Sequence, residues 1–113
     1  MTTPPVTEHL ITQMTATIVA TASPEAVVLF GSRATGCATE GSDVDFLVIQ
    51  SDDYGPSRPR HEEAVRILRA LAPTLVPADV LVYSRREVEE WRDSRNHIVG
   101  RALREGRVLY GRA

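Results

Sequence analysis

The sequence predicts an α/β protein of the α+β type, in which helices cover one small mixed sheet. Three short runs, at residues 26–30, 43–50 and 78–83, are rich in valine, leucine and isoleucine, as strands are. The segments around these runs repeat apolar residues at helical spacing. The chain has 113 residues, the length of one domain, so we expect a single domain over residues 1–113.

The first third of the chain predicts a helix followed by a buried strand. Residues 1–6 contain two threonines and two prolines, so we expect a flexible lead-in. Over residues 7–21 apolar side chains fall on one helical face, with Thr7 as a candidate N-cap. Ser23-Pro24 ends this helix. The continuous apolar run 26–30 is typical of a strand that is covered on both faces.

The next segment predicts a tight turn and then a strand with an acidic beginning. Gly31 ends the first strand, a single helical turn follows, and residues 37–42 form a loop. Side chains alternate along the strand 43–50, so Asp43 and Asp45 share one face, ahead of two apolar residues. This face therefore changes from charged to apolar along the strand.

The second half of the chain predicts a further strand between helices. Residues 51–59 form a loop, and 60–72 form an amphipathic helix that packs on the sheet. After a turn between Pro73 and Pro77, residues 78–83 form a third strand, with Asp79 near its beginning.

Helices and a short edge strand are predicted for the last thirty residues. Residues 84–87 have the form of a capping box, and the helix that they open should direct Val88 and Trp91 inward. Ser94 is a candidate second cap for a helix that ends at Gly106, and residues 108–110 can form a short edge strand.

Composition and charge exclude several classes of protein. Hydrophobic residues make up 42% of the chain and charged residues 25%, a balance typical of globular proteins rather than of disordered or membrane-spanning chains. The net charge of −2 indicates no basic surface for sequence-independent nucleic-acid binding. The first residues lack the pattern of a secretion signal, and a single cysteine cannot form an internal disulfide. We therefore expect a cytoplasmic protein that does not bind membranes, and nucleic-acid binding is not indicated.

Five residues in the predicted turns and strand ends can carry chemistry. Gly31 has no side chain, so a phosphate can approach the backbone there, and Ser32 adds a hydroxyl and an amide N–H. Asp43 and Asp45 have a spacing suited to oxygen-coordinated cations such as Mg²⁺. If the second and third strands are neighbours, Asp79 converges with them. Taken alone, each feature is more often a tight turn or a solvated strand end, so the information lies in their combination.

The combination resembles the nucleotidyltransferase superfamily of the DNA polymerase β type. Gly31-Ser32, a ten-residue spacer and Asp43-Val44-Asp45 lie between apolar strands, and Asp79 follows later. Within that superfamily the chain is similar to the minimal nucleotidyltransferases over about residues 8–110. It departs from them at Thr35, where relatives often carry a basic residue, and this puts a phosphate contact at that position in doubt.

The resemblance implies a polymerase β-like nucleotidyltransferase fold, with ATP as substrate and two Mg²⁺ ions. The catalytic and metal-binding residues would be Asp43, Asp45 and Asp79. The nucleotide-binding residues would be Gly31, Ser32 and Arg33. Ser32 would hold the β- and γ-phosphates, and Arg33 would neutralise charge there. Asp79 would help to deprotonate the attacking hydroxyl, either directly or through a metal-bound water.

The resemblance also implies a partner. Larger relatives add a helical domain that recognises the acceptor, and a domain of this size leaves no residues for one. Minimal nucleotidyltransferases similar to this chain are commonly the antitoxins of two-protein modules, and their partner is a helical HEPN-type ribonuclease toxin. Transfer of AMP from ATP to a tyrosine hydroxyl of such a toxin is therefore the leading hypothesis. Two alternatives stay open: a non-catalytic antitoxin of the same fold, and a free-standing nucleotidyltransferase, monomeric or homo-oligomeric, that modifies a small-molecule hydroxyl.

Overall fold

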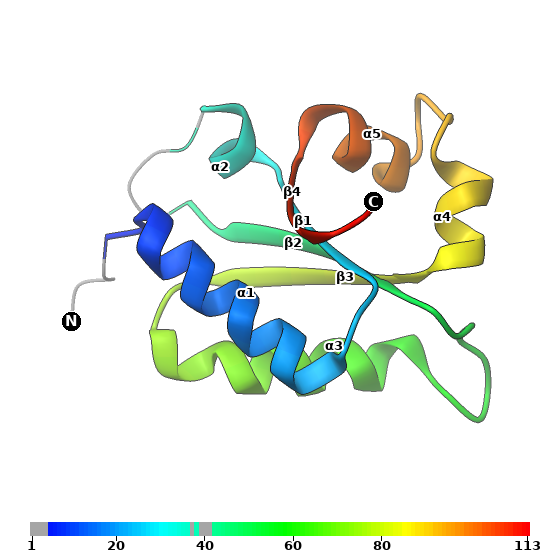
Figure 1. The fold of residues 1–113 in the computed structure, drawn as a ribbon, viewed down its shortest axis with the longest axis horizontal. Helices are drawn as coiled ribbons and strands as arrows, with labels where there is room; N and C mark the ends of the chain where they lie inside the picture. The colour runs from blue at the N-terminus through cyan, green and yellow to red at the C-terminus, as the bar shows by residue number, and fades with distance from the viewer. Residues whose placement is uncertain (1–4, 37, 39–41) are drawn as a thin grey trace.

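The computed structural model describes residues 5–36, 38 and 42–113, so most of the loop predicted over 37–42 and residues 1–4 of the lead-in lie outside the described residues. The described residues form a four-stranded mixed sheet with helices on both faces, which confirms the predicted fold class (Figure 1). The strands are β1 (Ala26–Phe30), β2 (Val44–Gln50), β3 (Ala78–Ser84) and β4 (Arg107–Gly111). The α-helices are α1 (Glu8–Ala22), α2 (Ser32–Thr35), α3 (Arg60–Leu71), α4 (Arg85–Trp91) and α5 (Ile98–Glu105).

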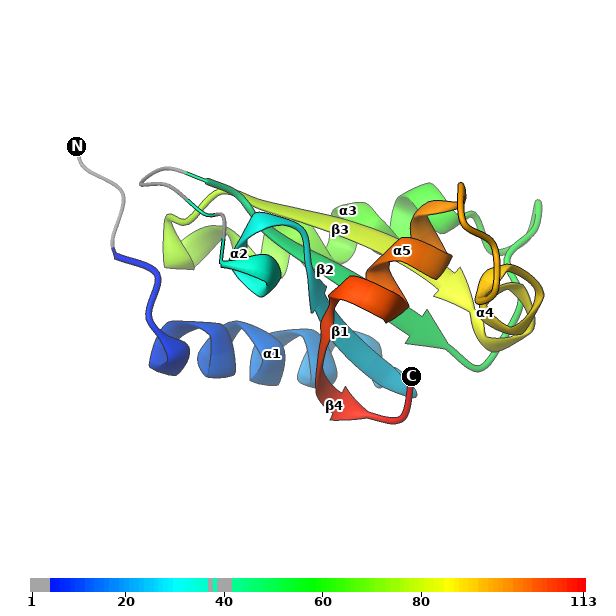
Figure 2. The same ribbon diagram turned by 90° about the horizontal axis from the view of Figure 1, so that it is seen from above.

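The strands lie in the order β3-β2-β1-β4. β1 is antiparallel to both of its neighbours, whereas β2 and β3 are parallel and are connected through α3 (Figure 2). A parallel pair requires such a crossover, because the chain must return to the starting end of the sheet. As a result, the end of β1 and the beginnings of β2 and β3 meet at one end of the sheet.

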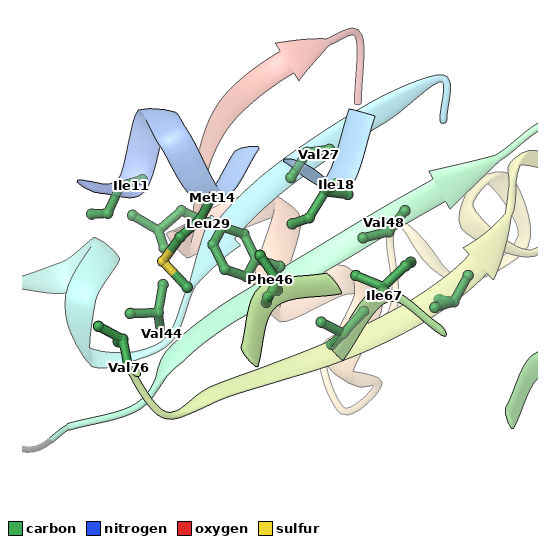
Figure 3. Close-up of a cluster of buried hydrophobic side chains, with 13 residues drawn as sticks. Ile11, Met14, Ile18, Val27, Leu29, Val44, Phe46, Val48, Ile67 and Val76 are labelled. Carbon is green, nitrogen blue, oxygen red and sulfur yellow. The ribbon is translucent and has the colours of Figure 1, made fainter. Parts of the chain in front are cut away.

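Two apolar layers enclose the sheet. On one face α1 and α3 cover side chains of β1, β2 and β3, with Phe46 and Met14 fully buried between them (Figure 3). On the other face α4 and α5 contribute Val88, Val99 and Ala102 to a smaller cluster. β1 is therefore buried on both sides, as its continuous apolar sequence predicts.

The helix signals read from the sequence are mostly confirmed. The Thr7 hydroxyl accepts a hydrogen bond from the Leu10 N–H at 3.1 Å and caps α1, which ends at Ser23 in the left-handed conformation. Ser84 and Glu87 form both hydrogen bonds of the capping box at the start of α4. In the described part of the chain, no helix combines the length and the apolar character that a membrane span requires.

The start of the last helix differs from the prediction. The N-cap of α5 is His97 rather than Ser94, because the His97 Nδ1 accepts a hydrogen bond from the Val99 N–H at 3.1 Å. The ring of Trp91 stacks on His97, with centroids 4.3 Å apart, and the side chain stays 38% exposed. Trp91 thus covers the turn between α4 and α5 and is only partly directed inward.

The α1/α3 layer generates a prediction for stability. We expect Phe46→Ala to lower the free energy of unfolding by about 3–5 kcal/mol, because the deletion leaves a cavity in a fully buried position. The control Leu75→Ala removes a side chain that is 61% exposed and should change that free energy by less than about 0.5 kcal/mol. Urea denaturation followed by circular dichroism measures both, and equal losses would contradict this description of the core.

Candidate active site

The three predicted acids gather at one end of the sheet. Asp45 on β2 is the register partner of Asp79 on β3 and of Phe30 on β1. Side chains of register partners project from the same face, so the three form a row across the sheet. Asp43 precedes the first residue of β2 and is close enough to influence the titration of Asp45. The apolar part of this face lies farther along β2, under α4 and α5.

Gly31 fits the space beside Asp45. Its φ of +74° lies in the left-handed region, which glycine adopts without strain. A Cβ at this position would overlap the Asp45 Oδ2 and lie 3.2 Å from the Asp45 Cγ. Glycine is therefore required for two independent reasons, one of backbone conformation and one of space. Its carbonyl accepts hydrogen bonds from the N–H groups of Ala34 and Thr35, which fixes the turn of α2.

Partial burial and two neighbouring carboxylates make it costly to ionise Asp45. Its partial burial raises the pKa of the carboxyl above its usual value, and the neighbouring Asp79 and Asp43 raise it further. A bound divalent cation would relieve this repulsion, and carboxylate oxygens are the ligands that Mg²⁺ prefers. The donor set therefore fits a hard cation.

The acids do not enclose a metal position in the arrangement seen here. No group of three or more His, Cys, Asp or Glu side chains among residues 5–36, 38 and 42–113 is placed to hold an ion. Asp79 is exposed, and its Oδ1 accepts a hydrogen bond from the Val80 N–H at 3.0 Å. Asp43 is exposed as well, so both outer side chains have free space in which to change rotamer.

Arg33 connects α2 with the beginning of β2. Its Nη2 donates a hydrogen bond to the Ser42 carbonyl at 2.9 Å, and its buried Nε has no hydrogen-bond partner among the described atoms. The side chain thereby holds the residue that precedes Asp43 against the turn that begins with Ser32. A role of Arg33 in phosphate binding stays a prediction, and the contact with Ser42 was not evident from the sequence.

A small pocket adjoins Gly31 and was not anticipated from the sequence. It has a volume of about 120 Å³ and lies between the end of β1 and α5. Its lining residues are Phe30, Gly31, Ile98, Arg101, Ala102 and Glu105. The sequence pattern of the arginines in this region is typical of a solvated helical face. Arg101 differs from the others because α5 lies over β1 and places it beside the pocket.

Comparison with protein families identifies the family to which this fold belongs. A family model described as "Polymerase beta, Nucleotidyltransferase" matches residues 13–113. A search of curated proteins found no match.

Several solved structures share the fold, among them the following three. A chain of a toxin–antitoxin with AMP-PNP is 21% identical, with a TM-score of 0.55, and the match covers 89% of this chain and 73% of that one. A candidate nucleotidyltransferase from Sulfolobus solfataricus is 17% identical, with a TM-score of 0.56 and coverages of 92% and 79%. A chain of the complex between the tri-AMPylated Shewanella oneidensis HEPN toxin and the MNT antitoxin is 19% identical, with a TM-score of 0.53 and coverages of 94% and 74%. At these identities the similarity concerns the fold.

The contact between Gly31 and Asp45 generates a prediction for stability, and a variant of Gly36 serves as the control. Gly31→Ala and Gly36→Ala both place a side chain at a positive φ, of +74° and +80°, but nothing lies within 4 Å of a Cβ at Gly36. Both variants should lose about 1–2 kcal/mol of stability from backbone strain. Gly31→Ala should lose about 1 kcal/mol more, because Asp45 must move. Urea denaturation measures the difference, and its absence would contradict the close approach.

The raised pKa of Asp45 generates a prediction on pH and stability. The folded protein binds a proton at Asp45 more tightly than the unfolded chain does, so this residue destabilises the fold when it is ionised. We expect Asp45→Asn to raise the Tm in metal-free buffer at pH 7. The difference should shrink as the pH falls through the pKa of Asp45, because the wild type then becomes neutral at this position too.

The exposed Asp43 provides the comparison for this measurement. Asp43→Asn should raise the Tm less than Asp45→Asn does, because water solvates the Asp43 carboxylate better. Thermal melts in the presence of a chelator between pH 4 and pH 8 would test both variants. A lower Tm for Asp45→Asn at pH 7 would show that its charge stabilises the metal-free protein.

Proposed function

The chain belongs to the nucleotidyltransferase family of the polymerase β type, and on this premise we propose that it transfers AMP from ATP to a tyrosine hydroxyl of a HEPN-type toxin, for which it is the antitoxin. The observation that carries the transfer is the placement of Asp45 between Asp79 and the Gly31 turn. The acceptor is supported by likeness in fold to a toxin–antitoxin with AMP-PNP and to a complex that contains a tri-AMPylated HEPN toxin.

The residues of the site divide into two groups in this proposal. Asp43, Asp45 and Asp79 hold Mg²⁺, which when bound neutralises charge on the triphosphate and makes the acceptor hydroxyl more acidic. The backbone of Gly31 and the amide and hydroxyl of Ser32 contact the β- and γ-phosphates. The positive charge of Arg33 lies on the same turn and attracts the phosphates while its Nη2 donates to the Ser42 carbonyl.

The proposed reaction is a displacement at the α-phosphorus. The acceptor oxygen forms a bond to the α-phosphorus as the bond to the bridging oxygen of the β-phosphate breaks, and pyrophosphate leaves. The Asp79 carboxylate accepts the proton of the hydroxyl. Both Asp79 and Asp43 are exposed, so a hydroxyl on the surface of another protein has access to the acidic end of the sheet.

The proposal predicts the outcome of a labelling experiment. ATP labelled at the α-phosphate is incubated with Mg²⁺, the chain and a purified HEPN-type toxin from the same genome. We expect the label on a toxin tyrosine, identified by mass spectrometry as an adenylate. The variant Asp43→Ala/Asp45→Ala should reduce the labelling rate by at least about a thousandfold, because it removes the ligands of the ions that assist the reaction.

A matched control separates charge from position. Asp52→Ala/Asp93→Ala removes two exposed loop carboxylates and therefore the same net charge, and it should label the toxin like the wild type. If the toxin stays unlabelled, and the wild type and the Asp43→Ala/Asp45→Ala variant neutralise it equally, the proposal is wrong. The chain would then be a non-catalytic antitoxin. Transfer to small hydroxyl compounds without any toxin would instead indicate a free-standing transferase.

A further inference from the structure

We propose that Arg101 on α5 is a substrate-binding residue that contacts the β- and γ-phosphates of the nucleotide from across the pocket beside Gly31. This inference rests on the proposed function, because it assumes that a nucleoside triphosphate binds at the Gly31 turn. It assigns a part of the site to α5, where Arg101 lies about seventy residues after the glycine–serine motif in the sequence.

The pocket connects Arg101 with the candidate site. Phe30 and Gly31 line its β1 side, and Arg101 and Glu105 line its α5 side. Phe30 is the register partner of Asp45, and Gly31 packs against the Asp45 carboxylate, so the pocket and Asp45 adjoin the same two residues. α5 packs on the same face of the sheet as these acids, over the apolar part of β1 and β2 (Figure 2).

The charge of Arg101 is available to a ligand. The Arg101 Nη2 lies 3.8 Å from the Glu105 Oε2, and the two side chains are 58% and 52% exposed. Exposed pairs of this kind, four residues apart on a helix, contribute only a few tenths of a kcal/mol. Arginine binds phosphate with two parallel charge-assisted hydrogen bonds, which are stronger than such a pair. A phosphate in the pocket would therefore replace Glu105 as the partner of Arg101.

The rest of the turn provides limited positive charge. The Nη2 of Arg33 is occupied by the Ser42 carbonyl, and Thr35, at the following polar position of α2, carries no charge. Cationic side chains stabilise the charge of a triphosphate together with its metal ions, and three carboxylates lie near this turn. Arg101 is placed to provide one from the opposite side of the pocket.

The size of the pocket limits what it can hold. Its volume is about 120 Å³. Roughly four water molecules occupy this volume in liquid water. Pockets that enclose a whole drug-sized ligand measure about 300–1,000 Å³. The space beside Gly31 therefore suits phosphoryl groups, and the nucleoside must extend away from it.

Binding measurements with ATP·Mg²⁺ and with AMP test the inference on the full chain. Arg101→Gln should weaken ATP binding about tenfold, the value of a hydrogen bond to a charged group, and leave AMP binding unchanged. Glu105→Gln should tighten ATP binding about twofold, because it removes the competing carboxylate. The control Arg69→Gln removes an exposed arginine from α3, on the opposite face of the sheet, and should leave both affinities unchanged.

The opposite effects of the two α5 variants separate substrate binding from a structural role. If Arg101 served only to hold α5 in place, Arg101→Gln and Glu105→Gln would both weaken ATP binding, and AMP binding would fall with it. That result would overturn the inference, as would an ATP affinity of Arg101→Gln equal to that of the wild type. A wild-type chain that binds no ATP·Mg²⁺ would overturn the proposed function itself.

Discussion

The position of β2 between an antiparallel and a parallel neighbour is the constraint on which the site depends. Because β1 runs toward the end of the sheet at which β2 and β3 begin, the turn after β1 and the first residues of both other strands meet. No local signal brings Gly31, Asp45 and Asp79 together. The burial of β2 on both faces holds the register, since a shift by one residue would turn Asp45 into the α1/α3 core.

Much of the fold could be predicted because its elements are strongly patterned. The valine-rich runs, the cap at Thr7 and the capping box at Ser84 each depend on a few neighbouring residues. The pairing of β4 with β1 depends on contacts across some eighty residues, so local patterns do not report it. The cap of α5 was misplaced at Ser94 because a serine before an apolar stretch is a common start, whereas His97 fills the role with a ring nitrogen.

The candidate site also contains residues that the sequence identifies and contacts that only the fold reveals. The glycine, the serine and the three aspartates could be named from the sequence, because their order and spacing form a recognisable motif. The contact of Arg33 with Ser42 and the pocket below Arg101 depend on how a loop and a distant helix fold back on the sheet. Among thirteen basic residues, nothing in the linear pattern distinguishes Arg101 from the other arginines that surround it.

The contact between Gly31 and Asp45 also restricts how the sequence can change over time. A larger residue at position 31 meets the carboxylate of position 45, so its cost depends on which residue stands there. A shorter residue at position 45 would remove the overlap, but it would also remove the carboxylate. The positive φ at position 31 would still disfavour any residue other than glycine. The two positions are therefore epistatic, and every order of single substitutions that puts a side chain at position 31 either displaces or removes the Asp45 carboxylate.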